Sequence, residues 1–330
     1  MTRPIVGRVA PGQRRATGTP APTAEPVTAR IAVDLLGGDH APAVVVDGAL
    51  RAFQDDPSLH LLLVGPVDAA DAVLAALDPV ERQRVVAEPV SDVADAGVRA
   101  AVLAVAEGRA DAAVSAGSTA AVVISAARDL GRRPGVRRPP LAAVLPTAAG
   151  RLVLLDVGSA VDPDAHTLVM HAHLGAAYAA VVHEVTEPRV GLLTIGTEPG
   201  KGDRLRRALP DLLAALELPA GARFVGRVEG HDVVLGDAAD VVVTDGFTGN
   251  ILLKGLETAY ARLGPPGGGA GGVPPRAAML LGVEGTVVVC HGAATAPDLA
   301  AGIALAAQLH RRSAIAAMAE LIPHIEVSHE

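Results

Sequence analysis

The stretch Ile31–Pro42, IAVDLLGGDHAP, holds the pattern on which the fold of this chain depends. An apolar run of strand length ends in two glycines, and the segment Ala43–Phe53 that follows has apolar residues at helical spacing. The same succession of apolar run, small polar loop and helical segment recurs along the chain. The runs that predict buried strands are Ile31–Leu36, Leu59–Val64, Ala110–Val114, Leu152–Asp156, Arg189–Ile195, Asp240–Thr244 and Thr286–Cys290.

Helical patterns follow most of these runs. The clearest are Ala43–Phe53, Ala120–Leu130, Ala165–Val182 and Gly249–Leu263. This alternation predicts an α/β fold in which a mostly parallel sheet is covered by helices on both faces. Ligands of such sheets bind outside the carboxyl ends of the strands, so we expect the functional groups in the loops that follow the strands.

The composition narrows the class of protein. The 330 residues are 50% hydrophobic but only 2% aromatic, so Ala, Val and Leu must fill the core. A formal net charge of −8 argues against nucleic acid as a partner, because the chain lacks a broad basic field. The single cysteine, Cys290, leaves no internal disulfide and no cysteine-based zinc site, which fits a reducing cytoplasm.

Two segments stand apart from the α/β pattern. We interpret residues 1–29, which contain four Arg among Pro, Thr and Ala, as a disordered leader, and residues 30–330 as a single α/β domain. Residues 264–275 are almost entirely Gly and Pro and predict a break in that domain. No apolar run reaches the ~18 residues of a membrane-spanning helix, so we expect a cytoplasmic protein that is at most peripherally associated with membranes.

The loop after the first predicted strand contains Gly37, Gly38, Asp39 and His40. Two glycines let backbone amides approach a ligand closely, and the next helix offers free N–H groups to an anion. The alternative is a tight strand-to-helix turn that Asp39 caps.

Similar loops follow later strands. In the loop Ser115–Thr119, Ser118 or Thr119 is expected to cap a helix, and the same hydroxyl and amide groups suit phosphate. Asp156 ends an apolar run ahead of Gly158, and its carboxylate either binds a neighbouring loop or lines the site.

Further polar groups follow the remaining strands. Lys201 lies between glycines, and His291 follows the last predicted strand. Asn250 and Lys254, four residues apart, share one face of a helix near its start, where an amide and an ammonium suit an oxyanion or phosphate. We expect Asp245, Asn250, Lys254 and the loops Gly37–His40 and Ser115–Thr119 to converge on one cleft. His171 and His173, by contrast, are expected on the surface.

With these loops in order, the chain resembles the phosphate acyltransferase family of bacterial phospholipid synthesis, PlsX. The resemblance extends from about residue 30 to about residue 310. The stretches that carry it are Ile31–Pro42, Val114–Thr147, Leu154–Val161, Pro188–Gly202, Phe224–Lys254 and Leu280–Gly292.

The resemblance implies a Rossmann-like core and a homodimer. It also implies transfer of a fatty acyl group from acyl-carrier protein to inorganic phosphate, giving an acyl phosphate that a membrane glycerol-3-phosphate acyltransferase uses. Phosphate is already an anionic nucleophile and a thiolate leaves readily, so we expect no cofactor and no metal. The residues expected to be catalytic are Asp245, Asn250, Lys254 and His40.

The expected substrate site is larger than this catalytic group. Residues expected to bind substrate or phosphate are Gly37, Gly38, Asp39, Ser115, Gly117, Ser118, Thr119, Asp156, Gly158, Lys201, Gly246 and His291. The acidic carrier protein needs a basic surface, and the candidates are Arg132, Arg133, Arg137 and Arg138. A solvated loop is the alternative for that cluster.

The chain departs from the family's pattern in several places. Ser118-Thr119-Ala120 stands where the family has Asn-Thr-Gly, and Gly158-Ser159-Ala160 where it has Gly-Ala-Asn. A Lys-Lys-Asp-Ser-Ser stretch is missing near residues 93–99, and the Gly/Pro segment replaces a long apolar hairpin. These departures leave open the alternative that the protein is a catalytically impaired relative of the family, which binds acyl-carrier protein or phosphate as a regulatory module. Related enzymes, a coenzyme A-dependent phosphotransacetylase or a nicotinamide-linked decarboxylating dehydrogenase, are a third interpretation.

Overall fold

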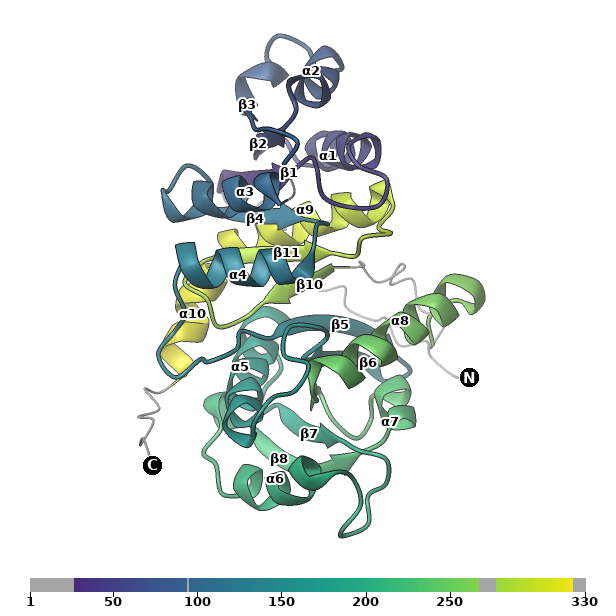
Figure 1. The fold of residues 1–330 in the computed structure, drawn as a ribbon. Helices are drawn as coiled ribbons and strands as arrows, with labels where there is room; N and C mark the ends of the chain where they lie inside the picture. The colour runs from purple at the N-terminus through teal and green to yellow at the C-terminus, as the bar shows by residue number, and fades with distance from the viewer. Residues whose placement is uncertain (1–26, 94, 267–276, 323–330) are drawn as a thin grey trace, which may run out of the picture.

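The computed structural model describes residues 27–93, 95–266 and 277–322. Within these residues, eleven strands form one sheet in the order β3-β2-β1-β4-β11-β10-β5-β6-β9-β7-β8 (Figure 1). The strands are β1 (Ala29–Asp34), β2 (Leu59–Gly65), β3 (Val85–Pro89), β4 (Ala112–Ser115), β5 (Leu141–Thr147), β6 (Gly150–Leu155), β7 (Arg189–Leu193), β8 (Arg223–Val228), β9 (Val241–Val243), β10 (Ala277–Leu280) and β11 (Thr286–Cys290).

Helices cover both faces of the sheet, as the sequence predicts. On one face pack α1, α2, α5, α6, α9 and α10, and on the other α3, α4, α7 and α8. The helices are α1 (Ala43–Asp55), α2 (Val67–Ala75), α3 (Ala96–Ala106), α4 (Thr119–Asp129), α5 (Ala165–His183), α6 (Arg204–Ala214), α7 (Gly230–Leu235), α8 (Gly246–Leu263), α9 (Ala296–Arg311) and α10 (Ala314–Leu321), with 3₁₀ turns at Glu81–Arg84 and Pro219–Gly221. The predicted fold class is therefore confirmed.

Strand direction is where the sheet departs from expectation. Strands β3, β2, β1, β4 and β11 run parallel to one another, and so do β6, β9, β7 and β8. Between these sets, β10 is antiparallel to both β11 and β5, and β5 is antiparallel to β6. Three successive reversals make the two sets run in opposite directions. The carboxyl ends of the two sets of strands therefore point in opposite directions. The loops that follow one set and the loops that follow the other lie at opposite ends of the strands, and the assumption that all of them lie at the same end is wrong.

Each apolar run predicted as a strand corresponds to a strand of the sheet, but β3, β5, β8 and β10 were not predicted. Edge strands β3 and β8 are only partly buried and so lack a continuous apolar run. Strand β10 has four residues, too few to carry a periodic signal. Strand β5 (LAAVLPT) contains Pro146, which is unfavourable inside a ladder.

The expectation for two histidines was wrong. His171 and His173 lie in α5, which packs between the sheet and α6 and α10, and are 0% and 3% exposed. Each ring nitrogen that bonds does so to a backbone carbonyl, Nε2 of His171 to Arg138 at 3.0 Å and Nδ1 of His173 to Val169 at 3.0 Å. A helix buried nearly all round has no polar face on which a histidine would be exposed.

The structure describes only part of the segments that stand apart from the pattern. Strand β1 begins at Ala29, one residue before the expected domain boundary, and the leader residues 1–26 lie outside the described chain. Residues 267–275 of the Gly/Pro break lie outside it as well. Among the described helices, none is both long and apolar enough to cross a bilayer.

Candidate active site

The loops after β1 and β4 pass each other in close contact. A β-carbon on Gly37 would lie 2.5 Å from the backbone nitrogen of Gly117, so a glycine is required there. The adjacent Gly38 has a φ of +108°, a conformation that side-chain-bearing residues rarely adopt. The next amide, that of Asp39, donates a 2.7 Å hydrogen bond to the carbonyl of Gly292. Three loops, which follow β1, β4 and β11, thus meet at one edge.

A buried carboxylate holds these loops together. Asp34, at the end of β1, is 1% exposed and accepts hydrogen bonds from the hydroxyl of Ser115 at 2.6 Å and from the amide of Leu36 at 3.0 Å. Ser115 in turn accepts a bond from the amide of Gly117. Burial raises the pKa of the Asp34 carboxyl above its ordinary value, although these hydrogen bonds oppose the rise.

The expected caps in these loops are partly as predicted. Ser118 is the N-cap of α4, and its hydroxyl accepts from the amide of Ala121. Asp39 does not cap α1, because Pro42 occupies the N-cap position without a side-chain hydrogen bond. The side chains of Asp39 and His40 are exposed. The capped-turn alternative for Asp39 is therefore wrong.

The carboxylate of Asp156 binds its own loop and does not face an open site. It is fully buried and accepts from four backbone amides, those of Leu141, Gly158, Ser159 and Ala160, at 2.5–3.1 Å. Of the two alternatives that the sequence left open, the structure thus has the loop-binding one.

That loop places Asn250. The side-chain amide of Asn250 donates a 2.9 Å hydrogen bond to the carbonyl of Val157, and a β-carbon on Gly158 would lie 3.1 Å from the same nitrogen. Gly158 has a φ of +147°. The bond occupies one N–H of Asn250, and its second N–H and its carbonyl oxygen remain for a ligand.

The carboxylate of Asp245 is held by hydrogen bonds and an ion pair within the protein. It is the N-cap of α8, where its carboxylate accepts from the amide and hydroxyl of Thr248, each at 2.7 Å, and pairs with the buried guanidinium of Arg206. Burial opposes ionisation of Asp245, but the bonds from Thr248 and Arg206 outweigh it and hold its pKa below the ordinary value. Asp245 and Phe247 line a separate depression beside α6. Among the described residues, Asp245 therefore lies outside the lining that contains Asn250, and its catalytic role stays a prediction.

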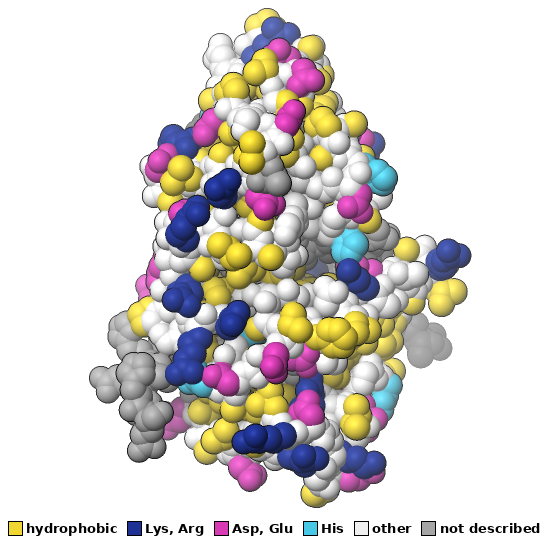
Figure 2. All heavy atoms as spheres, viewed as in Figure 1, with side chains coloured by type: hydrophobic (Ala, Val, Ile, Leu, Met, Phe, Trp, Pro, Cys, Tyr) yellow, Lys and Arg dark blue, Asp and Glu magenta, His cyan; other side chains and the backbone are white. Residues whose placement is uncertain are grey.

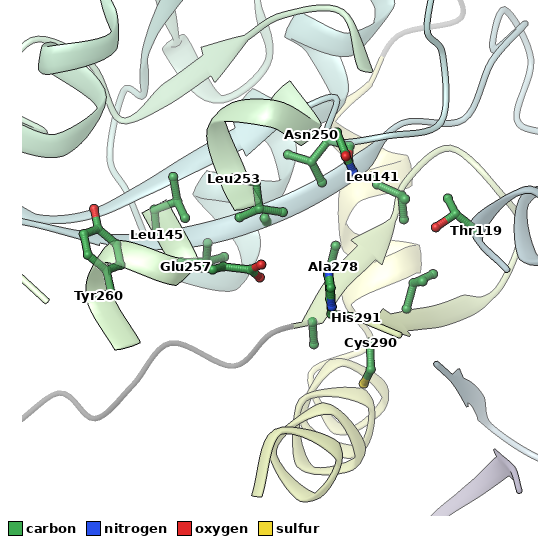
Figure 3. Close-up of a pocket in the computed structure, with 15 residues that line it drawn as sticks. Thr119, Leu141, Leu145, Asn250, Leu253, Glu257, Tyr260, Ala278, Cys290 and His291 are labelled. Carbon is green, nitrogen blue, oxygen red and sulfur yellow. The ribbon is translucent and has the colours of Figure 1, made fainter. Parts of the chain in front are cut away.

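One pocket combines polar groups from both halves of the sheet. Thr119 of α4, Asn250 of α8 and His291 after β11 line it together (Figure 3). Convergence is possible because α4 and α8 both cross the same face of the sheet, so α8 reaches back over β5 toward the edge where β11 ends. Thr119, Asn250 and His291 are thus brought together although their strands end at opposite edges.

His291 presents one defined donor. The amide of Ala293 donates to Nδ1 of His291 at 3.1 Å, so the proton of the neutral ring is on Nε2. Glu257 of α8 adds a carboxylate to the pocket lining, and in Figure 3 it points from the helix into the pocket. The remaining lining is mainly apolar and comes from β5, β10, β11 and α8.

Other predicted residues lie outside this lining. Lys254 is one turn beyond Asn250, but its side chain is exposed, and its neighbours Leu253 and Glu257 face the pocket instead. Lys201 is exposed in the loop after β7, in the half of the sheet away from β11. Gly246 is buried at the start of α8, where its amide donates to the carbonyl of Ala160. The expected convergence of all these residues is therefore partial.

The arginine cluster lies between α4 and β5. Arg132 donates to the carbonyl of Arg137 at 2.8 Å, Arg137 pairs with Asp164 at 3.0 Å, and Arg133 lies 3.7 Å from Glu284. Arg132, Arg137 and Arg138 are exposed. Figure 2 shows Lys and Arg side chains gathered along this side of the molecule.

Sequence reasoning missed Asp34, Arg206 and Glu257. Asp34 stands inside the quoted stretch Ile31–Pro42, three residues before Gly37. Glu257 stands in the helical pattern Gly249–Leu263, seven residues or two helical turns after Asn250. Arg206 carried no local signal, because its partner Asp245 is distant in the sequence. Cys290 is 2% exposed, and burial, with the charge of Asp298, raises the pKa of its thiol to about 12, as expected of a core residue.

The sequence was compared with protein families and with individual known proteins, and both comparisons give the same family. A family model described as "Fatty acid synthesis protein" matches residues 29–264. The chain is 41% identical over 324 residues to a phosphate acyltransferase of Thermobifida fusca (strain YX), covering 87% of this chain and 89% of that one. It is 43% identical over 241 residues to a phosphate acyltransferase of Bacillus subtilis (strain 168), covering 69% and 71%.

Solved structures share the fold at low sequence identity. A phosphotransacetylase from Streptococcus pyogenes matches with a TM-score of 0.59 and 18% identity, covering 88% of this chain and 94% of that one. The EutD phosphotransacetylase from Staphylococcus aureus matches with a TM-score of 0.57 and 16% identity over the same shares. The family match and the close relatives show that the chain belongs to the phosphate acyltransferase family of enzymes.

Proposed function

We propose that this protein transfers a fatty acyl group from acyl-carrier protein to inorganic phosphate, which yields acyl phosphate and free carrier thiol. The observation that carries the proposal is the pocket in which Thr119, Asn250 and His291 meet an apolar lining. An acyl thioester needs such a site, with polar donors at the reacting carbonyl and apolar contact for the chain.

In the proposed reaction, a phosphate oxygen attacks the thioester carbonyl carbon. The carbonyl electrons move to oxygen in the tetrahedral intermediate, and they return as the carbon–sulfur bond breaks and the thiolate leaves with its electron pair. Donors for the oxyanion are the hydroxyl of Thr119, the free N–H of Asn250 and the Nε2 proton of His291. One such donor contributes about 10²–10³-fold in rate in enzymes where it has been removed.

Phosphate itself is proposed to bind at the loops joined by Asp34 and Ser115. Helix α4 begins directly after the second of these loops, and the amides of its first turn are the proposed donors to the anion. His40 and Lys254 have exposed side chains, and we propose that they attract the anion at the mouth of the pocket.

The impaired-relative alternative receives less support. Ser118 is exposed and Ala160 is buried under α8, and neither belongs to the pocket lining among the described residues. The departures from the family's pattern at these positions therefore leave the proposed oxyanion donors in place.

Carrier protein, a second copy and a membrane enzyme are the proposed partners. The exposed arginines between α4 and β5 offer positive charge to an acidic carrier protein. Val161 and Phe247, 61% and 58% exposed, line one depression, and a second copy of the chain in a homodimer would cover them. Acyl phosphate is reactive, so a membrane glycerol-3-phosphate acyltransferase is the proposed consumer, with this protein in the cytoplasm.

The test is an assay of the full chain with acyl-carrier-protein thioester and phosphate. We expect acyl phosphate, trapped by hydroxylamine, to appear together with an equal amount of free carrier thiol. Omitting phosphate should abolish both products, and acyl coenzyme A serves as the comparison donor. Absence of acyl phosphate with either donor would overturn the proposal.

A further inference from the structure

The apolar part of the pocket is a groove between α4 and α8, floored by β5, β10 and β11. The groove is shallow: the volume free to the centre of a water-sized sphere is about 70 Å³, and the groove is partly open to solvent. We refer to it as the α4–α8 groove. Thr119, Asn250 and His291 lie at only one end of the groove, so the apolar remainder has no part in the proposed chemical step (Figure 3).

Two small side chains, those of a pair of alanines, leave space on the floor of the groove. Ala143 of β5 and Ala278 of β10 are direct partners in the antiparallel ladder, and both face the side of the sheet covered by α4 and α8. Larger residues, Leu141 and Leu145, stand two positions away on the same face of β5. A pair of larger side chains at the alanine positions would fill the groove.

The roof is a single stripe of α8. Asn250, Leu253, Glu257 and Tyr260 all line the pocket at spacings of three, four and three residues, which puts them on one helix face. From Asn250 to Tyr260 the helix rises ~15 Å. This is about half of the ~30 Å hydrocarbon thickness of a bilayer, the length that one lipid acyl chain spans.

The groove has a polar end and an apolar end. Figure 3 shows Thr119, Asn250 and His291 on one side of the pocket and Tyr260 with Leu145 at the other. Tyr260 is 6% exposed, so its ring acts as a wall. Glu257 lies between the two ends, and its partly exposed carboxylate points into the groove from α8 (Figure 3).

We infer that the α4–α8 groove holds the acyl chain of the substrate and that Ala143, Ala278 and Tyr260 determine which chain lengths are accepted. The inference rests on the proposed function, because it assigns the thioester carbonyl to the end at Thr119, Asn250 and His291. The chain then extends over the alanine pair toward the ring of Tyr260. These residues determine specificity and take no part in the chemical step.

The experiment measures kcat/KM of the full chain for a series of saturated acyl-carrier-protein thioesters, from short to long. Ala278→Leu should lower kcat/KM for long chains by about tenfold or more relative to short ones, since a methylene pocket discriminates by 10–200-fold. Tyr260→Ala should shift the preference toward longer chains. Ala143→Val is a milder variant, should the leucine prevent folding.

Matched controls separate the groove from general effects. Tyr260→Phe keeps the ring and removes a hydroxyl that has no hydrogen-bond partner in the described chain, so the length profile should not change. Ala304→Leu makes the same side-chain change on the exposed side of α9. A length profile unaltered by both Ala278→Leu and Tyr260→Ala would overturn the inference.

A binding measurement distinguishes failure of the groove from failure of the proposed function. Saturated fatty acids of increasing length should raise the melting temperature of the protein, and Ala278→Leu should remove the effect of the long ones. If no acyl phosphate forms but this length-dependent binding is observed, the function is wrong and the groove stands. If acyl phosphate forms and binding is the same for wild type and Ala278→Leu, the groove assignment is wrong.

Discussion

The hydroxyl of Ser115 donates a 2.6 Å hydrogen bond to the carboxylate of Asp34, and this bond joins the ends of β4 and β1 beneath the loops proposed to bind phosphate. Both groups are buried. Neither side chain lines the pocket, so the pair acts by holding the loops after β1 and β4 in place. The protonation state of the Asp34 carboxyl should therefore affect the stability of the folded protein.

Asp34→Asn should remove a specific pH dependence of stability. Burial raises the pKa of Asp34 in the folded protein, so folding favours its protonated form. That contribution is complete below the unfolded-state pKa of about 3.9 and is lost as the pH rises through the higher folded-state pKa. Urea unfolding over this pH range should show wild type losing stability relative to Asp34→Asn. The exposed Asp92→Asn is the control, and parallel curves for wild type and Asp34→Asn would contradict the prediction.

Asp245→Asn should show the opposite pH dependence. The pKa of Asp245 is lowered in the folded protein, so its ion pair with Arg206 stabilises above the unfolded-state pKa and is lost as the pH falls through the folded-state value. Removing one partner of a buried pair costs about 3–5 kcal/mol, so the variant should lose about that much near neutral pH. The difference from wild type should shrink in acid. Asp211→Asn, exposed on α6, should behave as wild type, and a constant difference down to acid pH would refute the assignment.

Asn250→Ala should lower kcat about 10²-fold, because it removes an oxyanion donor and the bond to Val157 that orients it. Cys290→Ala should change kcat little, since burial raises the pKa of that thiol to about 12 and the proposed reaction needs no acyl-enzyme. The measurement is single-turnover kinetics with radiolabelled acyl-carrier protein, with and without phosphate. Label trapped on Cys290 without phosphate would show that a two-step route operates instead.

Arg138→Glu should lower kcat/KM for the acyl-carrier-protein thioester roughly tenfold at low salt. The decrease should be smaller at high salt, where surface charges are screened. The side chain is exposed, while the backbone carbonyl of Arg138 accepts from His171, so the variant should keep its fold. Arg51→Glu, on α1, is the control for net charge. Equal effects of the two variants would indicate that no docking surface lies between α4 and β5.

The isolated protein should bind phospholipid vesicles weakly at physiological salt. Residues 264–275, GPPGGGAGGVPP, contain no set of large apolar side chains from which an interfacial surface forms. Cosedimentation with anionic vesicles is the measurement, and a chain with residues 264–275 replaced by a Gly-Ser linker is the control. Strong cosedimentation of the unmodified chain alone would contradict the expectation.

Hydrophobic periodicity was sufficient to predict seven of the strands and the main helices, and the motifs pointed to the family and to the loops that contain Thr119, Asn250 and His291. The sequence also indicated that Cys290 is a core residue and that Ser118 or Thr119 caps a helix. These features depend on neighbours within one or two turns of the chain, and local pattern is sufficient for them.

How those loops meet depends on the pairing and direction of strands that are distant in the sequence. The reversals at β10 and β5 put the ends of β1 and β9 at opposite edges, and helices α4 and α8, crossing one face, bring Thr119 and Asn250 back to one pocket. Strand order and direction arise from backbone pairing between residues far apart in the chain, as Ala143 pairs with Ala278. The burial of His171 and the pairing of Arg206 with Asp245 have the same origin. A local apolar pattern reports that a segment is buried, but the partner against which it is buried is set by long-range packing.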